Sequence, residues 1–294
     1  MSNMSNLRLI ITTTRQLRQL IYQLDYQKTL AIDTEFYWRY RYYPELCLIQ
    51  IATSDNIYLI DAMAEKINLS MLRPIFFNQS ICKIMHSSKN DIKILKHYVK
   101  TTFNNIFDTQ TAMAFLGYPH QMSLKNILET LNLFSLNKQE KMSDWRLRPL
   151  TKAQISYAKA DVAYLHEIYN LLKLKLIGID HDLMFREEMN EICKNTLFSN
   201  LLNGNLSKIK TRNNYRLPDK VLINKAFQFL QELAQEKQIA AGIICSKHNL
   251  IKFIQSYLED PQDLKSKLSS GWRYDLFGQK ILQLVSRYQL ADAN

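Results

Sequence analysis

The chain has 294 residues, 47% of them hydrophobic, and carries a formal net charge of +11. This length suits about two domains with hydrophobic cores of their own. No apolar stretch reaches the ~18 to 20 residues of a membrane span, and the six glycines form neither a GxxxxGK(S/T) loop nor a GxGxxG turn. The sequence therefore argues against a membrane-spanning protein and against an ATP-driven or dinucleotide-dependent enzyme. Its positive charge suits a polyanionic partner such as a nucleic acid.

The N-terminus lacks the basic start, apolar run and cleavage site of a secretion signal. Four cysteines are scattered singly, mostly within apolar patterns: Cys47, Cys82, Cys193 and Cys245. Such cysteines are most simply reduced, buried thiols. We therefore expect a cytoplasmic protein.

Five short apolar stretches predict the strands of one sheet. The first three are Ala31–Phe36, Cys47–Ala52 and Asn56–Ile60. Because only short turns join them, these strands should be antiparallel. Two further strands, Lys83–His86 and Asn105–Phe107, would be reached through helical crossovers. The predicted fold class is α/β, with a mixed sheet flanked by helices.

Two acids stand at the end of the first strand. The apolar, β-prone stretch Thr29–Ile32 leads directly into Asp33, and Glu35 follows two residues later. Residues two apart on a strand share a face, so both carboxylates would project into one site while Thr34 points away. A divalent cation would remove their repulsion, and these hard oxygen ligands suit Mg²⁺ or Mn²⁺ rather than zinc. Taken alone, the pair is more simply a strand end with solvated charges.

A third acid is predicted to open a helix. After the strand Lys83–His86, the residues Ser87, Ser88 and Asn90 are typical of a helix start. Asp91 would then lie in the first turn of this helix. By itself, it is most simply an acid favoured there by the helix dipole.

The fourth acid lies in a long helical pattern from Thr151 to Leu176. Tyr157 and Asp161 are four residues apart and share a face of this helix. A carboxylate and a phenol held together in this way can bind a metal and position its attacking water. Tyr157 alone is most simply a half-buried tyrosine with its hydroxyl in water. The order and spacing of all these side chains together indicate a two-metal phosphodiester hydrolase.

The last part of the chain is predicted to be a separate helical module. A helical stretch from Glu187 to Leu202 is followed by a polar, basic connection that ends before Pro218. Three helical patterns follow, at Lys220–Gln238, Lys247–Leu258 and Gly278–Gln289. Residues 206–294 include 14 Lys and Arg and 8 Asp and Glu, a net charge of +6. We therefore expect a small, basic, all-α domain.

Four segments resemble the ribonuclease D group of 3′-5′ exonucleases. They are DTEF (Asp33–Phe36), YYPELCLIQIA (Tyr42–Ala52), FDTQTAMAFLGYP (Phe107–Pro119) and SDWRLRPLTKAQISYAKADVAYLHEIY (Ser143–Tyr169). The stretch Asp144–Thr151 is more diagnostic than the acids, which proofreading exonucleases share. The resemblance implies the ribonuclease H-like exonuclease fold, with the acids converging at one end of the central strands.

The resemblance also implies roles for the acids. Asp33, Glu35, Asp91 and Asp161 would hold two divalent metal ions, Mg²⁺ or Mn²⁺, while Tyr157 would help orient the nucleophilic water. Two such ions, ~3.5 to 4 Å apart, would stabilise the attacking oxygen and the departing 3′ oxygen. The product would be a nucleoside 5′-monophosphate.

Four further residues are candidates for substrate contact: Thr34, Phe36, His86 and Gln50. His86 matches the family's second motif, and two interpretations stay open for it: direct contact with substrate, or a ring hydrogen-bonded at the strand end. Gln50 is similar to a family position, but we interpret it as a structural hydrogen-bonding residue rather than a catalyst.

The segment SGWRYDLFGQKIL (Ser269–Leu282) resembles the helical HRDC-type domains that follow the exonuclease part of ribonuclease D. We therefore predict an exonuclease domain at 1–205 and an HRDC-like nucleic-acid-binding domain at 206–294. Relatives often carry two such domains, and this chain has room for one. The alternative is a helical bundle that only stabilises the chain or a dimer.

The resemblance implies a metal-dependent 3′-5′ exoribonuclease that trims RNA 3′ ends, including those of transfer RNA precursors. RNA is the expected partner, with no nucleotide cofactor and no obligate protein partner. Two alternatives stay open: an exonuclease acting on single-stranded DNA or short oligonucleotides, and a non-catalytic RNA-binding protein that kept the fold. The intact set of four acids and Tyr157 argues against the second, because unneeded clustered acids would only destabilise the fold.

Overall fold

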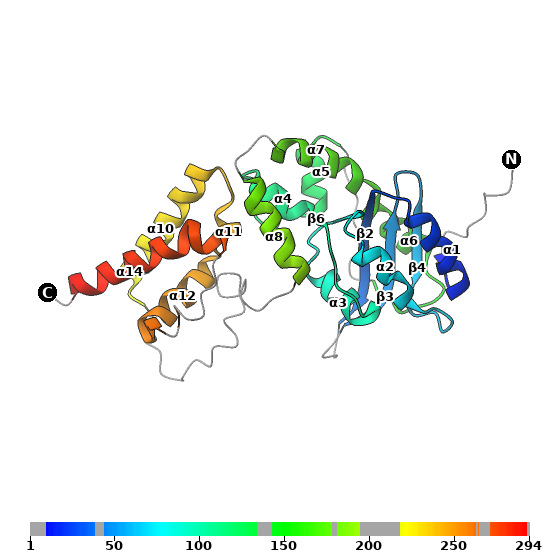
Figure 1. Ribbon diagram of the computed structural model, residues 1–294, viewed down its shortest axis with the longest axis horizontal. Coiled ribbons are helices and arrows are strands. Elements are labelled where there is room, and N and C mark those ends of the chain that lie inside the picture. Colours follow the sequence, from blue (N-terminus) through cyan, green and yellow to red (C-terminus); the bar gives the residue numbers. More distant parts are fainter. Residues whose placement is uncertain are drawn as a thin grey trace. The chain divides into compact units, whose positions relative to one another are not determined.

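The computed structural model describes residues 10–38, 44–133, 143–177, 181–194, 218–262, 264 and 271–292 (Figure 1). They form two compact units. The first draws on 1–112, 122–178 and 192–194, and the second on 113–121, 179–191 and 195–294. None of the helices in these described ranges has the length and apolar character needed to cross a membrane. All four cysteines are buried and none forms a disulfide, as predicted.

A mixed sheet lies in the first unit. Within the described residues it has six strands in the order β1-β4-β3-β2-β5-β6. They are β1 (Ile10–Ile11), β2 (Thr29–Tyr37), β3 (Glu45–Ala52), β4 (Ile57–Asp61), β5 (Cys82–Met85) and β6 (Ile106–Asp108). β2, β3 and β4 are antiparallel neighbours, whereas β5 pairs with β2, and β6 with β5, in parallel. The predicted mixed sheet is confirmed. β1, which pairs with β4 in parallel, was not predicted because two residues carry no periodic signal.

The pairing of β2 with β3 contains a β-bulge beside one of the acids. Glu35 pairs with Leu48 and Phe36 with Leu46, which leaves Cys47 as the extra residue. A bulge bends its strand and re-aims the side chains next to it. The extra residue lies on β3, so β3 is the strand that bends, at the point where it pairs with Glu35 and Phe36 of β2.

Helices flank the sheet, as the predicted fold class requires (Figure 1). α6 (Lys152–Ala163) packs against β2, β3 and β4, and α7 (Leu165–Ile177) packs against β2 and β5. α3 (Lys89–Val99) packs against β3. The other helices that begin in this unit are α1 (Thr14–Leu24), η1 (Leu69–Leu72), α2 (Arg73–Phe77), α4 (Thr109–Phe115) and α5 (Leu124–Thr130).

The single helix predicted over Thr151–Leu176 is wrong, because the structure has two helices there. α6 begins after Thr151, which forms a reciprocal capping box with Gln154. It ends before Tyr164, whose φ of −103° and ψ of 0° interrupt the helix. Both helices pack on the same sheet, so their apolar positions continue one periodic pattern and the sequence does not reveal the break.

The second unit is helical, as predicted. Its helices are α8 (Asp182–Lys194, of which the last three residues belong to the first unit), α10 (Lys220–Lys237), α11 (Ala241–Ile244), α12 (Lys247–Glu259), η3 (Tyr274–Gly278) and α14 (Gln279–Asp292). The three predicted C-terminal helices are thus present, with shifted ends. The helix expected from Glu187 begins earlier, at Asp182. Residues 195–217, which contain the predicted connection and the boundary between 205 and 206, lie outside the described residues.

A buried ion pair and an aromatic contact hold the second unit together. Glu188 of α8 pairs with Arg273, and both side chains are buried. Arg273 Nε also donates to the carbonyl oxygen of Ile243 at 3.0 Å. The neighbouring Trp272 ring lies 5.3 Å from that of Phe115, between centroids. Residues 113–121 and most of α8 therefore share a core with the C-terminal helices.

Candidate active site

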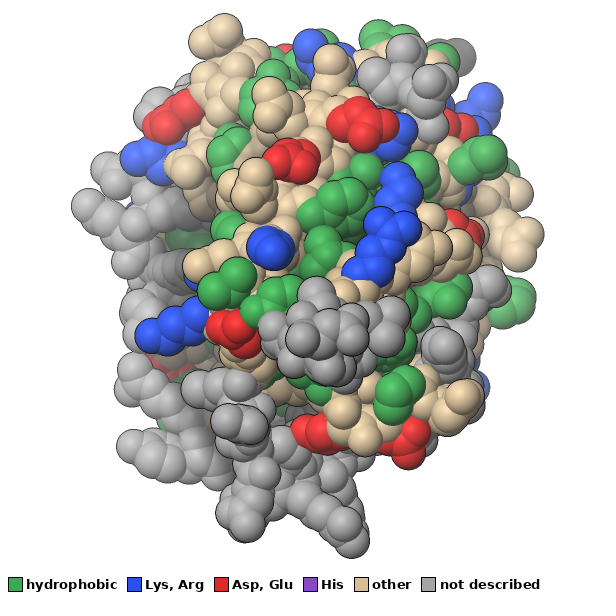
Figure 2. Space-filling view, turned by 90° about the vertical axis from the view of Figure 1, so that its left-hand side faces the viewer, with side chains coloured by type: hydrophobic (Ala, Val, Ile, Leu, Met, Phe, Trp, Pro, Cys, Tyr) green, Lys and Arg blue, Asp and Glu red, His purple; other side chains and the backbone are tan. Residues whose placement is uncertain are grey.

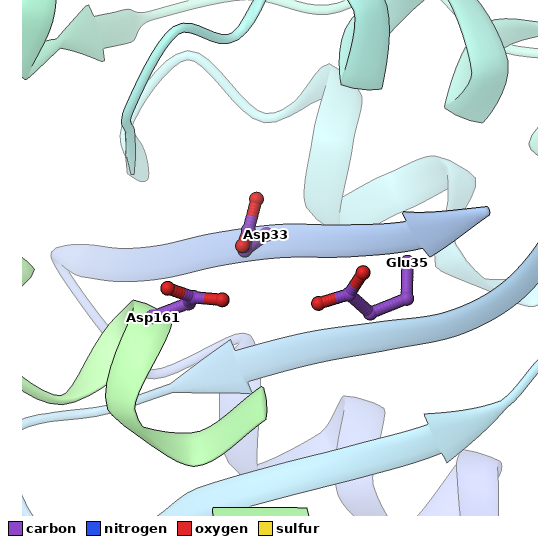
Figure 3. Close-up of side chains that lie close together, drawn as sticks. All are labelled: Asp33, Glu35 and Asp161. Carbon is purple, nitrogen blue, oxygen red and sulfur yellow. The ribbon is translucent and has the colours of Figure 1, made fainter. Parts of the chain in front are cut away.

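Three carboxylates from two elements gather in the first unit. Asp33 and Glu35 of β2 lie beside Asp161 of α6 (Figure 3). Each offers an oxygen atom that lies within 4.8 Å of the other two. Asp161 is buried, while the two acids of β2 are half-buried. Asp33 and Glu35 thus share a site, as their spacing on one strand predicted.

Asp91 approaches these acids from α3. It lies in the first turn of the helix, as predicted, and its side chain is buried. The hydroxyl of Thr34 donates a hydrogen bond to the Asp91 carboxylate. The expectation that Thr34 points away from the site is therefore wrong. Thr34 alternates with Asp33 and Glu35 along β2, and α3 brings Asp91 to it from the other side of the strand.

Burial and repulsion by neighbouring acids raise the pKa values of two of the acids, Asp33 and Asp91. Burial is the main reason that the pKa of Asp33 lies well above its ordinary value, and the charges of Asp91, Asp161 and Glu35 raise it further. Burial also raises the pKa of Asp91 to about 7, although the hydrogen bond from Thr34 acts in the opposite direction. The carboxylates therefore destabilise one another when ionised, and a divalent cation among them would relieve this cost.

Tyr157 lies one turn before Asp161 on α6 and is half-buried. Its ring centroid is 5.9 Å from that of Trp145. Burial is the main cause that raises the pKa of the phenol, and the charges of Asp161, Glu35 and Asp33 add to it. The hydroxyl therefore keeps its proton at neutral pH and can donate a hydrogen bond.

A pocket of about 480 Å³ lies over these side chains. The four acids and Tyr157 line it, as do three of the four candidates for substrate contact, Thr34, Phe36 and His86. Asp144 and Trp145, from the diagnostic stretch Asp144–Thr151, also line it. Tyr37, Trp38 and Leu124 line it as well, and these three were not singled out from the sequence. The pocket thus combines a carboxylate floor with several aromatic side chains.

His86 and Gln50 differ in their surroundings. Nδ1 of His86 lies 2.9 Å from the hydroxyl of Thr109, and His86 also lines the pocket, so each of its two interpretations has support. Gln50 pairs with Asp33 across the sheet and is fully buried. Within the described part of the chain neither polar atom of its side chain has a hydrogen-bond partner, so the structural hydrogen bonds expected for Gln50 are not found there.

Asp108 supports the site and was missed in the sequence. One carboxylate oxygen accepts hydrogen bonds from the backbone N–H and the hydroxyl of Ser88, both at 2.6 Å. The other accepts from the backbone N–H of Thr111 at 2.9 Å. These bonds fix the turn that leads into α3 and hence the position of Asp91. The available signal was the family-like segment Phe107–Pro119, in which Asp108 lies.

Arg148 anchors the loop that carries Asp144 and Trp145. Its guanidinium donates to both carboxylate oxygens of Asp61 at 2.7 Å and to the carbonyl oxygen of Cys47 at 2.9 Å. A bidentate pair of this kind fixes orientation as well as distance. Arg148 lies within the stretch that makes the resemblance specific, but a sequence motif alone does not reveal what a residue contacts.

The mixed sheet, with acids from its second strand and from the helices on either side, is the ribonuclease H-like exonuclease fold. Residues 9–177 match the family model described as 3′-5′ exonuclease. This match covers more than half of the chain. The chain therefore belongs to the 3′-5′ exonuclease family.

The relatives confirm the resemblance to ribonuclease D. Ribonuclease D of Nitrobacter hamburgensis is 35% identical over 167 residues, which are 57% of this chain and 44% of that protein. The match thus spans less than half of that relative's length. The crystal structure of Escherichia coli RNase D, described as an exoribonuclease involved in structured RNA processing, has a TM-score of 0.63 at 25% identity. It covers 95% of this chain and 74% of the other.

A third similar protein was solved with a metal ion. Brucella melitensis NrnC with bound Mg²⁺ has a TM-score of 0.52 at 26% identity, over 64% of this chain and 92% of that chain. In this chain the carboxylates of the pocket are themselves a donor set that suits a divalent cation. The donor atoms are all carboxylate oxygens, which are the ligands that Mg²⁺ and Mn²⁺ prefer.

Proposed function

We propose that this protein is a metal-dependent 3′-5′ exoribonuclease that removes nucleotides one at a time from RNA 3′ ends and releases nucleoside 5′-monophosphates. The observation that carries the proposal is the group of four acids and Tyr157 around one pocket. Membership of the 3′-5′ exonuclease family supports the direction of hydrolysis. The ribonuclease D relatives support RNA as the substrate.

Asp33, Glu35, Asp91 and Asp161 would hold two divalent ions, Mg²⁺ or Mn²⁺. The fit rests on the closeness of Asp33, Glu35 and Asp161, on the raised pKa values of Asp33 and Asp91, and on the hard oxygen donors of all four acids. When bound, such ions stabilise the attacking and departing oxygens of phosphodiester hydrolysis and lower the pKa of a coordinated water. Without a cation, the acids face each other's charge, so we expect the metal to stabilise the protein as well.

The protein's own side chains would position the reactants. The protonated phenol of Tyr157, beside Asp161, would donate a hydrogen bond that orients the attacking water. Thr34 holds the carboxylate of Asp91. Phe36 and His86 line the same pocket and are candidates to contact the terminal nucleotide. Each of these residues would therefore act through orientation rather than through covalent chemistry.

The C-terminal helices would contribute affinity for RNA. Residues 206–294 carry a net charge of +6, and Lys or Arg side chains beside phosphates gain affinity through counterion release. On the face that Figure 2 shows, Lys and Arg lie among hydrophobic and acidic side chains and do not form one continuous patch. We therefore infer a weak, distributed contribution. Transfer RNA precursors as substrates, the domain boundaries 1–205 and 206–294, and a cytoplasmic location stay predictions.

A labelled RNA tests the activity. The protein is incubated with a 5′-labelled transfer RNA that carries a few extra 3′ nucleotides, in Mg²⁺, Mn²⁺ or EDTA, beside a DNA oligomer of equal length. We expect a metal-dependent ladder that shortens from the 3′ end. Asp33→Ala should abolish the ladder, and Asp25→Ala, which changes an exposed aspartate outside the pocket, should not. Binding without shortening in any metal would favour a non-catalytic RNA-binding protein, and shortening of DNA alone would make DNA the substrate.

A further inference from the structure

Trp38 is the exposed tryptophan of this chain. The sequence has three tryptophans, and their exposed fractions are 48% for Trp38, 2% for Trp145 and 5% for Trp272. Trp38 follows Tyr37, the last residue of β2, and lines the pocket that holds the acids. A large apolar ring left half in water at the edge of a polar pocket gains little for folding, and such exposed apolar surface often marks a binding site.

Contacts of the neighbouring residues Phe36 and Tyr37 hold the Trp38 ring and its backbone in place. Its centroid lies 6.0 Å from that of Phe36, with an edge-on angle of 63°. Tyr37, between them, lies under the guanidinium of Arg146 at 3.6 Å from its ring centroid. Arg146 is itself fixed by two hydrogen bonds to Asp144, at 2.9 and 2.7 Å. The backbone that presents Trp38 is thus anchored to the loop on the other side of the pocket.

The chemistry of the pocket specifies the occupant. The carboxylates would direct the scissile phosphate to their cations, so the bases of the same strand must lie beside the acids rather than on them. Every nucleobase offers an apolar π-face, so any of the bases can stack on an aromatic ring. Such tolerance is what an enzyme needs if it removes successive nucleotides of any sequence.

We propose that the Trp38 ring is a stacking platform for one unpaired base of the RNA strand whose 3′ end enters the acid pocket. This inference rests on the proposed function. Trp38 would contribute to substrate affinity and to the preference for single-stranded 3′ ends, because a paired base has no free face to offer.

A set of variants tests the platform by affinity and rate. With Ca²⁺ in place of Mg²⁺, Trp38→Ala should bind a single-stranded RNA about tenfold more weakly, whereas Trp38→Phe should stay within about twofold because it keeps an aromatic face. In Mg²⁺, Trp38→Ala should raise KM by a similar factor with little change in kcat. Tyr22→Ala is the matched control, since Tyr22 is 69% exposed on α1 and does not line the pocket.

Fluorescence locates the stacked base without any need for hydrolysis. The other two tryptophans are buried. A change in tryptophan emission on RNA binding that Trp38→Phe abolishes therefore reports on Trp38. The probe is a 12-nucleotide RNA in Ca²⁺, compared with versions in which one of the last four positions is abasic. We expect the intact RNA to quench the emission and one abasic version to lose that quenching.

The outcomes separate the two proposals. If the wild type shortens RNA but Trp38→Ala keeps the normal KM, or if no abasic position alters the quenching, the platform is overturned and the exoribonuclease stands. If the wild type shortens no RNA in any metal, the proposed function is overturned. Position-specific quenching would then still support a base-stacking site.

Discussion

Glu188 of the second unit and Asp33 of the first unit are carboxylates in opposite electrostatic surroundings. In the second unit, the buried Glu188 is matched by the buried Arg273, which also donates to a backbone carbonyl. In the first unit, Asp33 lies among Asp91, Asp161 and Glu35, and each of these charges raises its pKa. The pair of Glu188 and Arg273 neutralises its own charge, whereas the acid cluster around Asp33 gathers negative charge only.

This difference separates a structural role from a functional one. Removing one partner of a buried pair leaves a charge without compensation and destabilises the fold. Removing one of several clustered acids relieves repulsion, so it should stabilise the fold while it destroys a cation site. The sign of the stability change therefore distinguishes the two kinds of carboxylate.

The largest effect should come from the acid cluster. Asp33→Ala or Asp161→Ala should lower the rate of RNA hydrolysis by at least about 10³-fold, more than about 4 kcal/mol, because a ligand of the proposed ions is lost. The same variants should unfold at a temperature equal to or above that of the wild type in EDTA. Single-turnover hydrolysis and thermal unfolding measure the two quantities. A variant with near-normal turnover would remove that acid from the proposed site.

The ion pair of the second unit should respond with the opposite sign. Arg273→Met should lower the free energy of unfolding by about 3 to 5 kcal/mol, because Glu188 stays buried without its partner. Urea unfolding of the full chain measures the change. Arg287→Met is the control, since Arg287 is exposed on α14. The double variant Arg273→Met with Glu188→Gln should recover part of the loss, and no recovery would argue that Arg273 acts through packing alone.

The acid cluster should also make stability depend on pH. The pKa of Asp91 is raised to about 7, so between its ordinary value and pH 7 the folded protein binds more protons than the unfolded chain. Stability in EDTA should therefore fall as the pH rises from 5 to 8. Thermal unfolding should show a smaller fall for Asp91→Asn, and the exposed Asp25→Asn should behave as the wild type. Mg²⁺ should restore stability at pH 8, and a wild type that gains stability with pH in EDTA would contradict the assignment.

Much of the sheet could be predicted because its strands have clear apolar runs. Five strands and the change from antiparallel to parallel pairing follow from run length and connection length. The break at Tyr164 could not be predicted, because α6 and α7 keep one apolar periodicity. The packing of Phe115 with Trp272 could not be predicted either, since it joins segments far apart in the chain.

In the site, sequence spacing predicts which side chains lie together on one strand or helix. Contacts between side chains of different elements depend on the tertiary structure. The strand period placed Asp33 with Glu35, and the helix period placed Tyr157 with Asp161. The contact between Thr34 and Asp91 depends on how α3 approaches β2, which no local pattern encodes. For the same reason the anchoring of the Asp144–Thr151 loop by Arg148 was not foreseen, although the loop itself was singled out.

A smaller effect is expected from the phenol next to the acids. Tyr157→Phe should lower the rate of hydrolysis about 10- to 100-fold, because a hydrogen bond to a charged reacting group contributes about 1.5 to 3 kcal/mol. Metal affinity should change little, since the carboxylates stay in place. Rates at saturating RNA and metal titrations measure the two effects, with Tyr22→Phe as an exposed control. A loss of metal affinity equal to the loss of rate would assign Tyr157 to the cation site itself.

The smallest effect should come from single positive charges on the C-terminal helices. Lys220 and Lys280 are exposed on α10 and α14. If each approaches a phosphate, Lys220→Gln with Lys280→Gln should reduce the slope of log affinity against log salt by about 0.7 per lost contact. Binding of RNA in Ca²⁺ at several salt concentrations measures the slope. The control is the double variant Lys28→Gln with Lys66→Gln, which changes two exposed lysines of the first unit.

Substitutions suit this question better than deletion of 206–294, because Trp272 and Arg273 also complete the core around Phe115 and Glu188. An unchanged slope would leave these helices with a structural role, as the charge pairing of Glu188 already indicates for their core.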